Sequence, residues 1–410
     1  MPSPPKPLLL AYPAFRLFWF ARGASALAFQ MQGVAVGWQI YSLTHRTLDL
    51  GLVGLAQFLP MVLLTLPAGH AADHFNRRTL CALAVTAQAC ALAVLAWGTA
   101  RGWLTTPTIF ALVAVIGAAR AFERPASQSL LPGLVSEETL PSAIVWSSSG
   151  FQAVSIAGPA VGGLVYAWVP FYCYAAAAGM SALAAILLVS IAYAPRPRAA
   201  VPVSAQSVLS GIHYIRGNPV VLGSISLDLF AVLLGGATAL LPAFAHDILR
   251  VGSRGLGALR AAPSVGSLAM SAFLVRHPLK RRVGRKMFAA VLTFGGATIA
   301  FGLSRSFAVS LIALGILGAA DMVSVVIRSS LVQLQTPDAM RGRVSAVNGL
   351  FIGTSNQLGE FESGVTAAWF GTVPATVLGG IGTLVVAWLW MRLFPSLKSY
   401  DRLEAKARAT

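Results

Sequence analysis

The sequence predicts an all-α, polytopic membrane protein with twelve transmembrane helices in two pseudo-symmetric six-helix bundles. Apolar residues make up 56% of the 410 residues and charged residues only 10%, whereas a soluble domain carries about 25% charged residues. Apolar stretches of about 20 residues, enough for one helix across a bilayer, recur along the whole chain. Lys and Arg gather in alternate connections between these stretches. Together these three observations fix the fold class.

The expected spans are interpreted as helices because a bilayer offers backbone amides no other hydrogen-bonding partner. They cover residues 14–43, 50–72, 79–100, 105–127, 139–167, 170–193, 219–244, 254–275, 287–305, 307–331, 344–370 and 374–394. The chain is therefore divided into an N-terminal segment, 1–13, a bundle, 14–193, a linker with an amphipathic helix, 194–218, a second bundle, 219–394, and a basic tail, 395–410.

Basic residues predict the orientation of the chain. The formal net charge is +17, which by itself would suit a nucleic-acid partner. The charge is instead concentrated at Arg77 and Arg78, between Arg276 and Lys286, and in the tail. By the positive-inside rule these segments and both termini are cytoplasmic. The partner implied is the lipid bilayer, and no nucleic acid.

A connection after the second span carries the first recognisable motif. The stretch "GHAADHFNRR" supplies Gly69, Asp73, Arg77 and Arg78. It resembles the loop signature of the major facilitator superfamily, with His74 replacing the usual Arg. We interpret it as a gating loop, in which Asp73 meets a helix end or an arginine in one state and releases it in another.

The fifth span carries a second motif, "GPAVGG", with Gly158, Pro159, Gly162 and Gly163. It resembles the helix-five signature of exporters in that superfamily. Small residues allow close helix approach and proline weakens the local hydrogen-bond ladder. Ordinary tight packing explains the pattern about equally well from physics alone. The stretch from Thr336 to Gly364 resembles bacterial enterobactin-type siderophore exporters, and this likeness extends over nearly the whole chain.

Ionisable residues within the expected spans are rare, and such residues usually face a cavity or a partner. In the facilitator fold that the resemblance implies, spans one, four, seven and ten line a central cavity, and two, five, eight and eleven flank it. Nearly all of the charges fall on those spans. They are Arg22, Arg120, Glu123, Arg124, Asp228, Arg260, Asp321, Arg328, Glu360 and Glu362.

Six of these residues, with Asn356, are candidates for proton coupling or the substrate cavity: Glu360, Glu362, Asp228, Asp321, Arg22 and Arg260. Burial favours the neutral form of a carboxylate, which suits a group that loads and releases a proton. Glu360 and Glu362 point about 200° apart on a helix, so one is expected to meet protons while the other braces a neighbour. We expect Glu360 to respond to protons and Glu362 to pair with Arg260. Asp228 either faces the cavity or bridges to an arginine.

The remaining charges, Arg120, Glu123, Arg124 and Arg328, are assigned to the cytoplasmic side. Glu123 and Arg124 are expected to form a structural or gating pair there, and Arg328 is expected to share that role. The alternative for Glu360 and Glu362 is that both are structural salt-bridge partners. Neither a P-loop nor a hydrolase or metalloprotease motif occurs in the sequence. No cofactor, metal or enzymatic activity is therefore expected.

These observations predict a proton-coupled exporter of the bacterial inner membrane, with a small-molecule substrate, a catecholate siderophore by resemblance. Two alternatives stay open: a multidrug or macrolide-type proton antiporter, and a lysophospholipid transporter on the same fold. We expect a monomer, with periplasmic or outer-membrane efflux components as further candidate partners.

Overall fold

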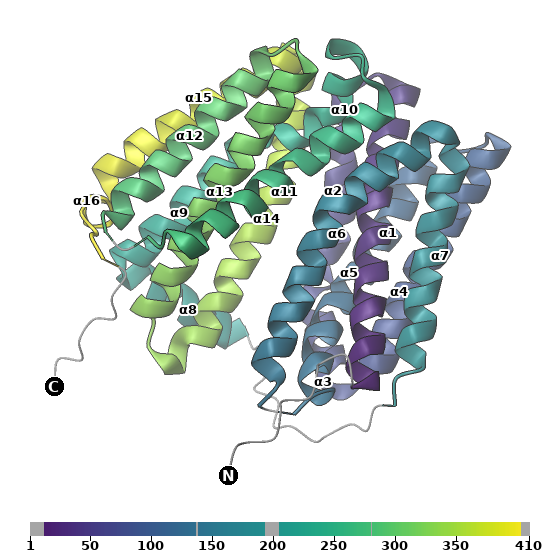
Figure 1. Cartoon of the computed structure of the whole chain (residues 1–410), viewed down its shortest axis with the longest axis horizontal. Coiled ribbons are helices and arrows are strands. Elements are labelled where there is room, and N and C mark those ends of the chain that lie inside the picture. The colour runs from purple at the N-terminus through teal and green to yellow at the C-terminus, as the bar shows by residue number, and fades with distance from the viewer. Residues whose placement is uncertain (1–11, 137, 193–204, 280, 403–410) are drawn as a thin grey trace. The chain divides into compact units, whose positions relative to one another are not determined.

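The computed structural model describes residues 12–136, 138–192, 205–279 and 281–402, and in this part of the chain the secondary structure is helical throughout (Figure 1). The chain forms two compact units. The first comprises Met1–Leu43 and Ala56–Pro202, and the second comprises Thr44–Leu55 and Val203–Thr410. The linker residues 193–204, Lys280, the first eleven residues and the last eight lie outside the described residues. The expected boundaries between segments at those places stay predictions.

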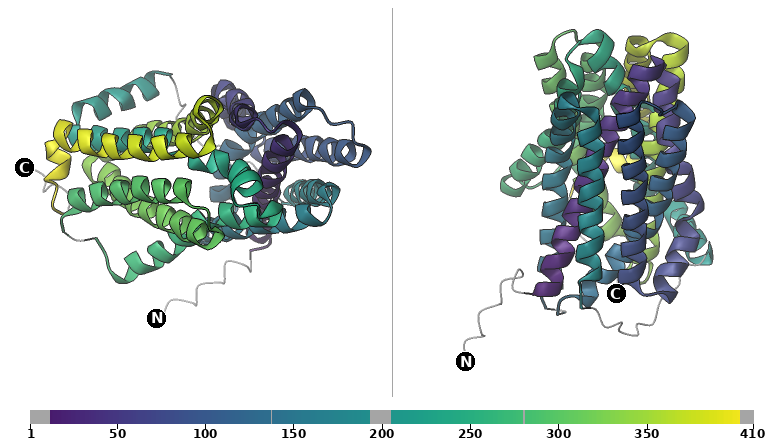
Figure 2. Two further views of the ribbon diagram at one scale, coloured as in Figure 1. Left: turned by 90° about the horizontal axis from the view of Figure 1, so that it is seen from above. Right: turned by 90° about the vertical axis from the view of Figure 1, so that its right-hand side faces the viewer.

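Long helices build the first unit. They are α1 (Pro13–Thr44), α3 (Thr65–His74), α4 (Arg77–Arg101), α5 (Thr106–Leu130), α6 (Leu140–Trp168) and α7 (Pro170–Val189), while α2 (Thr47–Leu63) begins in the second unit and ends in the first. The purple-to-blue helices of this unit run roughly alongside one another (Figure 2). Phe15 and Phe18 of α1, Val85 of α4 and Leu188 of α7 share one buried cluster. Because lipid tails are as apolar as these side chains, close van der Waals packing between the side chains holds the helices together.

The second unit is also helical. Its elements are α8 (Ala205–Gly217), α9 (Pro219–Leu234), η3 (Ala237–Leu240), α10 (Leu241–Ala243), η4 (Phe244–Ile248), α11 (Gly252–Arg276), α12 (Val283–Leu303), α13 (Phe307–Gln335), α14 (Asp338–Phe370), α15 (Thr372–Leu393) and α16 (Pro395–Lys398). Leu227 of α9, Phe288 of α12, Ile327 of α13 and Val386 of α15 pack into one core. The linker helix α8 packs through Ile215 against the end of α13 and the start of α14.

The all-α membrane fold expected from the sequence is confirmed. Every expected span is occupied by helix, and nine helices among the described residues are long and apolar enough to cross a membrane. Two expected spans are interrupted. The span at 50–72 breaks at Leu64, after Pro60, and the hydroxyl of Thr65 donates to the Met61 carbonyl over 2.7 Å. Pro67 lies four residues after Leu63, so it has no amide to donate to the Leu63 carbonyl and its ring crowds that turn, which explains why α2 ends there.

The span expected at 219–244 is a continuous helix only as far as Leu234. Gly235 and Gly236 follow, and a Cβ at Gly236 would lie 2.6 Å from the carbonyl oxygen of Gly359 on α14. Only glycine permits so close an approach between two backbones. The seventh span therefore continues as short 3₁₀, α and π turns to Ile248.

The end of the described chain completes the start of α12. The amides of Val283 and Gly284 donate to the carbonyls of Asp401 and Tyr400, over 3.2 and 2.9 Å. The amide of Arg282 donates to the Asp401 carboxylate over 3.0 Å. Helix starts leave amide donors without partners inside the helix, and this segment supplies acceptors for them.

Candidate functional site

The most deeply buried ion pair of the second unit joins α9 to α13. Asp228 and Arg328 are 5% and 3% exposed, and their charged groups are in direct contact. The sequence left open whether Asp228 faces the cavity or bridges to an arginine, and the structure shows the bridge. A buried charge without a partner costs several kcal/mol, so each of these residues stabilises the buried state of the other.

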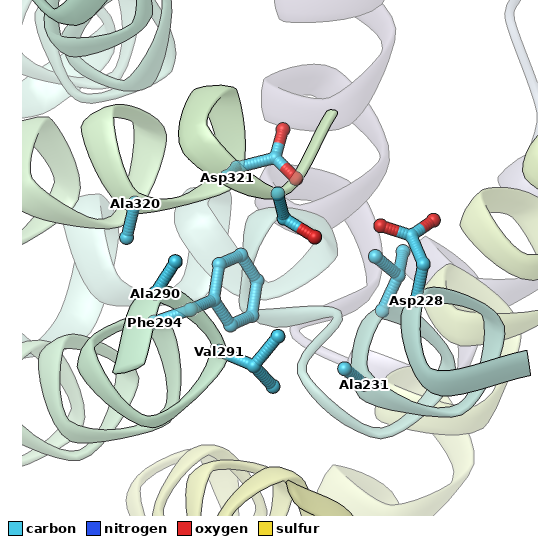
Figure 3. A pocket seen from close by; sticks show the side chains of 9 residues that line it. Asp228, Ala231, Ala290, Val291, Phe294, Ala320 and Asp321 are labelled. Atoms are coloured by element: carbon cyan, nitrogen blue, oxygen red, sulfur yellow. The ribbon is translucent and has the colours of Figure 1, made fainter. Parts of the chain in front are cut away.

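A narrow pocket of about 10 Å³, room for the centre of one water molecule, lies beside this pair, between α9, α12 and α13. Asp228, Asp321 and Ser324 supply its polar lining, and Phe294 of α12 supplies an aromatic wall. Figure 3 shows Asp228 and Asp321 reaching toward the pocket from different helices. The structure thus places at one pocket two carboxylates, Asp228 and Asp321, that were separate candidates in the sequence.

One face of α13 carries the polar groups. Asp321, Ser324 and Arg328 follow one another at spacings of three and four residues, which puts them on the same side of a helix. The Ser324 hydroxyl is buried and has no hydrogen-bond partner among the described residues. Among the same residues no ion pair or hydrogen bond of Asp321 is found. Asp321 therefore has no counter-charge among the described residues, although it lies beside the Asp228–Arg328 ion pair.

Glu360 on α14 interacts electrostatically with Arg260 on α11. Its carboxylate also lies against Gly54 of α2, where an added Cβ would come within 2.9 Å of Oε2. Both charged residues are half-buried. The expected brace between Glu362 and Arg260 is therefore wrong: Glu360 is the residue whose charge Arg260 meets. The rotation of α14 about its axis decides this, and spacing along the sequence does not report it.

Among the described residues, the hydrogen bonds of Glu362 are local. The Thr366 hydroxyl donates to its Oε1 over 2.7 Å and the Ser363 hydroxyl to its Oε2 over 3.5 Å, all within α14. Asn356, one turn before Glu360, is exposed and donates to the Ile352 carbonyl over 2.8 Å. The two glutamates thus point in different directions, as expected. Glu360, and not Glu362, is the one that meets Arg260.

We predict that Glu360→Gln lowers the melting temperature of the purified protein more than Glu362→Gln does. The first change leaves the Arg260 guanidinium without its carboxylate. Because both groups are half-buried, the loss should stay below the about 3–5 kcal/mol typical of a fully buried pair. In the second change the amide oxygen can still accept from Thr366. Thermal unfolding in detergent measures both, and a larger effect of Glu362→Gln would contradict the assignment.

The first unit carries its own group of charges, on α1 and α5. Arg120 Nη1 lies 3.0 Å from Glu123 Oε2, and the Ser25 hydroxyl donates to Glu123 Oε1 over 2.6 Å. The Arg120 guanidinium also lies 4.3 Å from the centre of the Phe29 ring, a cation–π contact. Glu123 therefore forms its salt bridge with Arg120 and not with Arg124, the partner expected from the sequence. Arg328, assigned by sequence to the same class, belongs instead to the Asp228 pair.

The arginines of the gating loop bind helix ends. Asn76 caps α4 by accepting from the amides of Arg78 and Thr79. Arg77 donates to the Ser129 carbonyl over 3.3 Å near the end of α5, and Arg78 to the Ile191 carbonyl over 2.8 Å beyond α7. The last carbonyls of a helix lack amide partners, and cations stabilise them. Gly69 lies within α3. The side chain of Asp73 is outside the described part, so its latch role stays a prediction.

The glycines of the fifth-span motif lie where α6 meets α1. A Cβ at Gly158 would come within 2.6 Å of Gln30 Cβ, and one at Gly162 within 2.8 Å of Met31 Cα. Pro159 and Gly163 are buried beside them. Close helix packing is thus present here, which is the plain structural explanation of the motif. It leaves the exporter interpretation to the comparisons.

The structure brings together one group of potential metal ligands that the sequence does not predict. His45, His246 and Asp247, all in the second unit, hold ligand atoms within 4.8 Å of one another. His246 Nδ1 lies 2.6 Å from Asp247 Oδ1, and the His45 and His246 rings are 5.1 Å apart. No spacing in the sequence predicts this group, because about two hundred residues separate His45 from the other two.

Apolar helices long enough to span a bilayer, with ionisable side chains held in pairs between them, define a multi-pass membrane transporter. Residues 5–409 match the profile of the major facilitator family described as transmembrane secretion effectors, and the chain belongs to this family.

Relatives named as exporters agree with this membership. The chain is 26% identical over 428 residues to the enterobactin exporter EntS of Escherichia coli O1:K1 / APEC, covering 98% of this chain and 97% of the relative. The protein of that name from Shigella boydii serotype 18 (strain CDC 3083-94 / BS512) matches with the same identity and coverage.

Two solved structures support the fold alone. A bacterial homologue of the human lysosomal transporter Spinster superposes with a TM-score of 0.73 at 13% identity, over 96% of this chain and 97% of its own. A bacterial homologue of the iron transporter ferroportin gives 0.71 at 17% identity, over 94% of this chain and 99% of its own.

Proposed function

We propose that the protein is a secondary active exporter that moves a catecholate siderophore out of the cytoplasm in exchange for protons. It acts in the bacterial inner membrane with both termini in the cytoplasm. The observation that carries the export of a siderophore is the match to enterobactin exporters over 98% of the chain. The absence of a P-loop from the sequence favours a secondary transporter over direct use of ATP.

Proton exchange rests on Asp321. Burial away from water disfavours a charged carboxylate that has no counter-ion. Asp321 lines the pocket beside the Asp228–Arg328 pair, so a proton arriving from water in that pocket would find an acceptor. When Asp321 loses the proton, its charge competes with Asp228 for Arg328 on the same face of α13. Protonation thereby changes which contact between α9 and α13 is favoured.

Such a change is what coupled transport requires. A ligand shifts an equilibrium between two conformations by its difference in affinity for them, and the proton is that ligand here. Uptake of a proton on one side of the membrane and release on the other then drives alternate exposure of the substrate site. Glu360 with Arg260 stabilises the position of α14 against α11 during the cycle.

Transport by the purified protein in liposomes tests this proposal. An iron-free catecholate siderophore should accumulate in the acidic compartment, and collapse of the pH gradient with nigericin should stop it. Liposomes without protein are the control. Transport of lipophilic cations or of lysophospholipid without any transport of the siderophore would reject the proposed substrate. Siderophore transport that ignores the pH gradient would reject proton exchange.

A further inference from the structure

The first unit holds more positive than negative charge within one cluster on α1 and α5. Arg22, Arg120 and Arg124 all interact electrostatically with Glu123. From the sequence, Glu123 is the only acidic residue within α1, α4, α5, α6 and α7. Three guanidinium groups thus share one carboxylate, and the cluster keeps two uncompensated positive charges.

The contacts show which charges are satisfied. Arg120 donates to one carboxylate oxygen of Glu123 over 3.0 Å, and the Ser25 hydroxyl donates to the other over 2.6 Å. The Arg120 Nε is buried without a hydrogen-bond partner among the described residues. Arg22 and Arg124 are repelled by Arg120 and attracted by Glu123, and neither forms a salt bridge in the described part of the chain. Their guanidinium donors are therefore available.

The cluster is also reachable. Arg22 is half-buried and Arg124 is exposed, while Arg120 and Glu123 are 7% and 8% exposed. Arg22, Ser25 and Phe29 share one face of α1, and Arg120, Glu123 and Arg124 share one face of α5, by their spacings of three and four residues. A fixed inner pair thus supports two outer arginines.

From this geometry we infer that the outer arginines, Arg22 and Arg124, bind the anionic group of the exported molecule, a carboxylate or an acidic catechol. Planar guanidinium groups form paired, charge-assisted hydrogen bonds with such oxyanions. Ionised side chains are costly within a membrane span unless they meet a partner, and an anion supplies that partner. This inference rests on the proposed function, because the ligand is the exported substrate.

A lipid headgroup shares this oxyanion chemistry. Arg22 is nine residues beyond Pro13, the start of α1, which is about 13 Å along a helix axis. The interfacial layer on each side of the hydrocarbon core is only about 5–8 Å thick. If α1 enters the bilayer at its first residue, Arg22 lies deeper than this layer, which favours a small-molecule anion.

Calorimetric titration of the full-length protein tests the inference with 2,3-dihydroxybenzoate, and with 2,3-dihydroxybenzamide as its uncharged counterpart. The wild type should bind the anion more tightly than the amide. Arg22→Gln and Arg124→Gln should each weaken anion binding about ten- to a hundredfold, as expected for the loss of a hydrogen bond to a charged group. Arg101→Gln, at the exposed end of α4, is the matched control and should bind as the wild type does.

Equal affinities for the anion in wild type and in both variants would overturn the inference, as would equal affinity for anion and amide. Nanodiscs of phosphatidylglycerol and of phosphatidylcholine separate the two anion sources. If phosphatidylglycerol blocks dihydroxybenzoate binding completely, the cluster holds a lipid headgroup and the inference fails. Siderophore transport by the same variants distinguishes the two proposals. If both variants bind and transport as the wild type does, only the anion site is rejected. If the wild-type protein itself transports no siderophore, the proposed function is rejected.

Discussion

Replacement of Asp321 by Asn should reduce pH-driven siderophore transport to the level of liposomes without protein. The amide has nearly the same volume, yet it neither takes up nor releases a proton. Because no ion pair or hydrogen bond of Asp321 is found among the described residues, this change breaks no contact there and the protein should fold normally. Exchange of siderophore across the membrane without a gradient should survive, since a permanently neutral side chain still permits the two states to interconvert.

Two comparisons make the Asp321→Asn experiment decisive. Asp321→Glu keeps a carboxylate and should retain part of the pH-driven transport. Unchanged thermal unfolding of Asp321→Asn would show that the loss comes from coupling and not from misfolding. If Asp321→Asn transports at the normal rate with its usual pH dependence, another carboxylate couples the proton, and Glu360 and Glu362 become the candidates.

Replacement of Arg328 by Met should have the largest effect on stability. Asp228 is 5% exposed, and the change leaves it charged and unpaired between α9 and α13. Breaking a buried pair by removing one member typically costs about 3–5 kcal/mol. We expect a clear fall in melting temperature and in the yield of folded protein, measured by thermal unfolding in detergent and by size-exclusion chromatography.

The double variant separates loss of the pair from loss of one side chain. Asp228→Asn together with Arg328→Met removes both charges, and it should recover most of the stability that Arg328→Met loses. Arg276→Met, at the exposed end of α11, is the control and should unfold as the wild type does. If the double variant is no more stable than Arg328→Met, the contribution of Arg328 lies in its packing and not in its charge.

The sequence predicts the helices well because lipid limits a spanning segment to one backbone structure. It fails where a break depends on another helix. Gly235 and Gly236 are consistent with a continuous span until the approach of Gly359 is known. Pro60 and Pro67 are both visible in the sequence, but a proline can bend a helix or end it. The helix α2 runs through Pro60 and ends before Pro67.

Candidate residues could likewise be named from the sequence, because charges are rare in membrane spans. Which of these residues pair with one another could not be predicted from the sequence. Arg260 lies one hundred residues before Glu360, and the rotation of each helix decides whether it meets that residue or Glu362. The same holds for Arg328, which the sequence groups with Arg124 and the structure pairs with Asp228. Spacing along one helix predicts shared faces, and only the packed bundle shows which faces meet.

The contacts between Asp401 and the start of α12 bear on how the protein is made. The bond from the Arg282 amide to Asp401 spans 119 positions, and domains generally fold as synthesis proceeds from the N-terminus. The first turn of α12 therefore lacks its acceptors, on Tyr400 and Asp401, until α13, α14 and α15 have left the ribosome. A nascent chain arrested before residue 400 would expose those amides, and protease protection at this helix start would report that biogenesis of the second unit is complete.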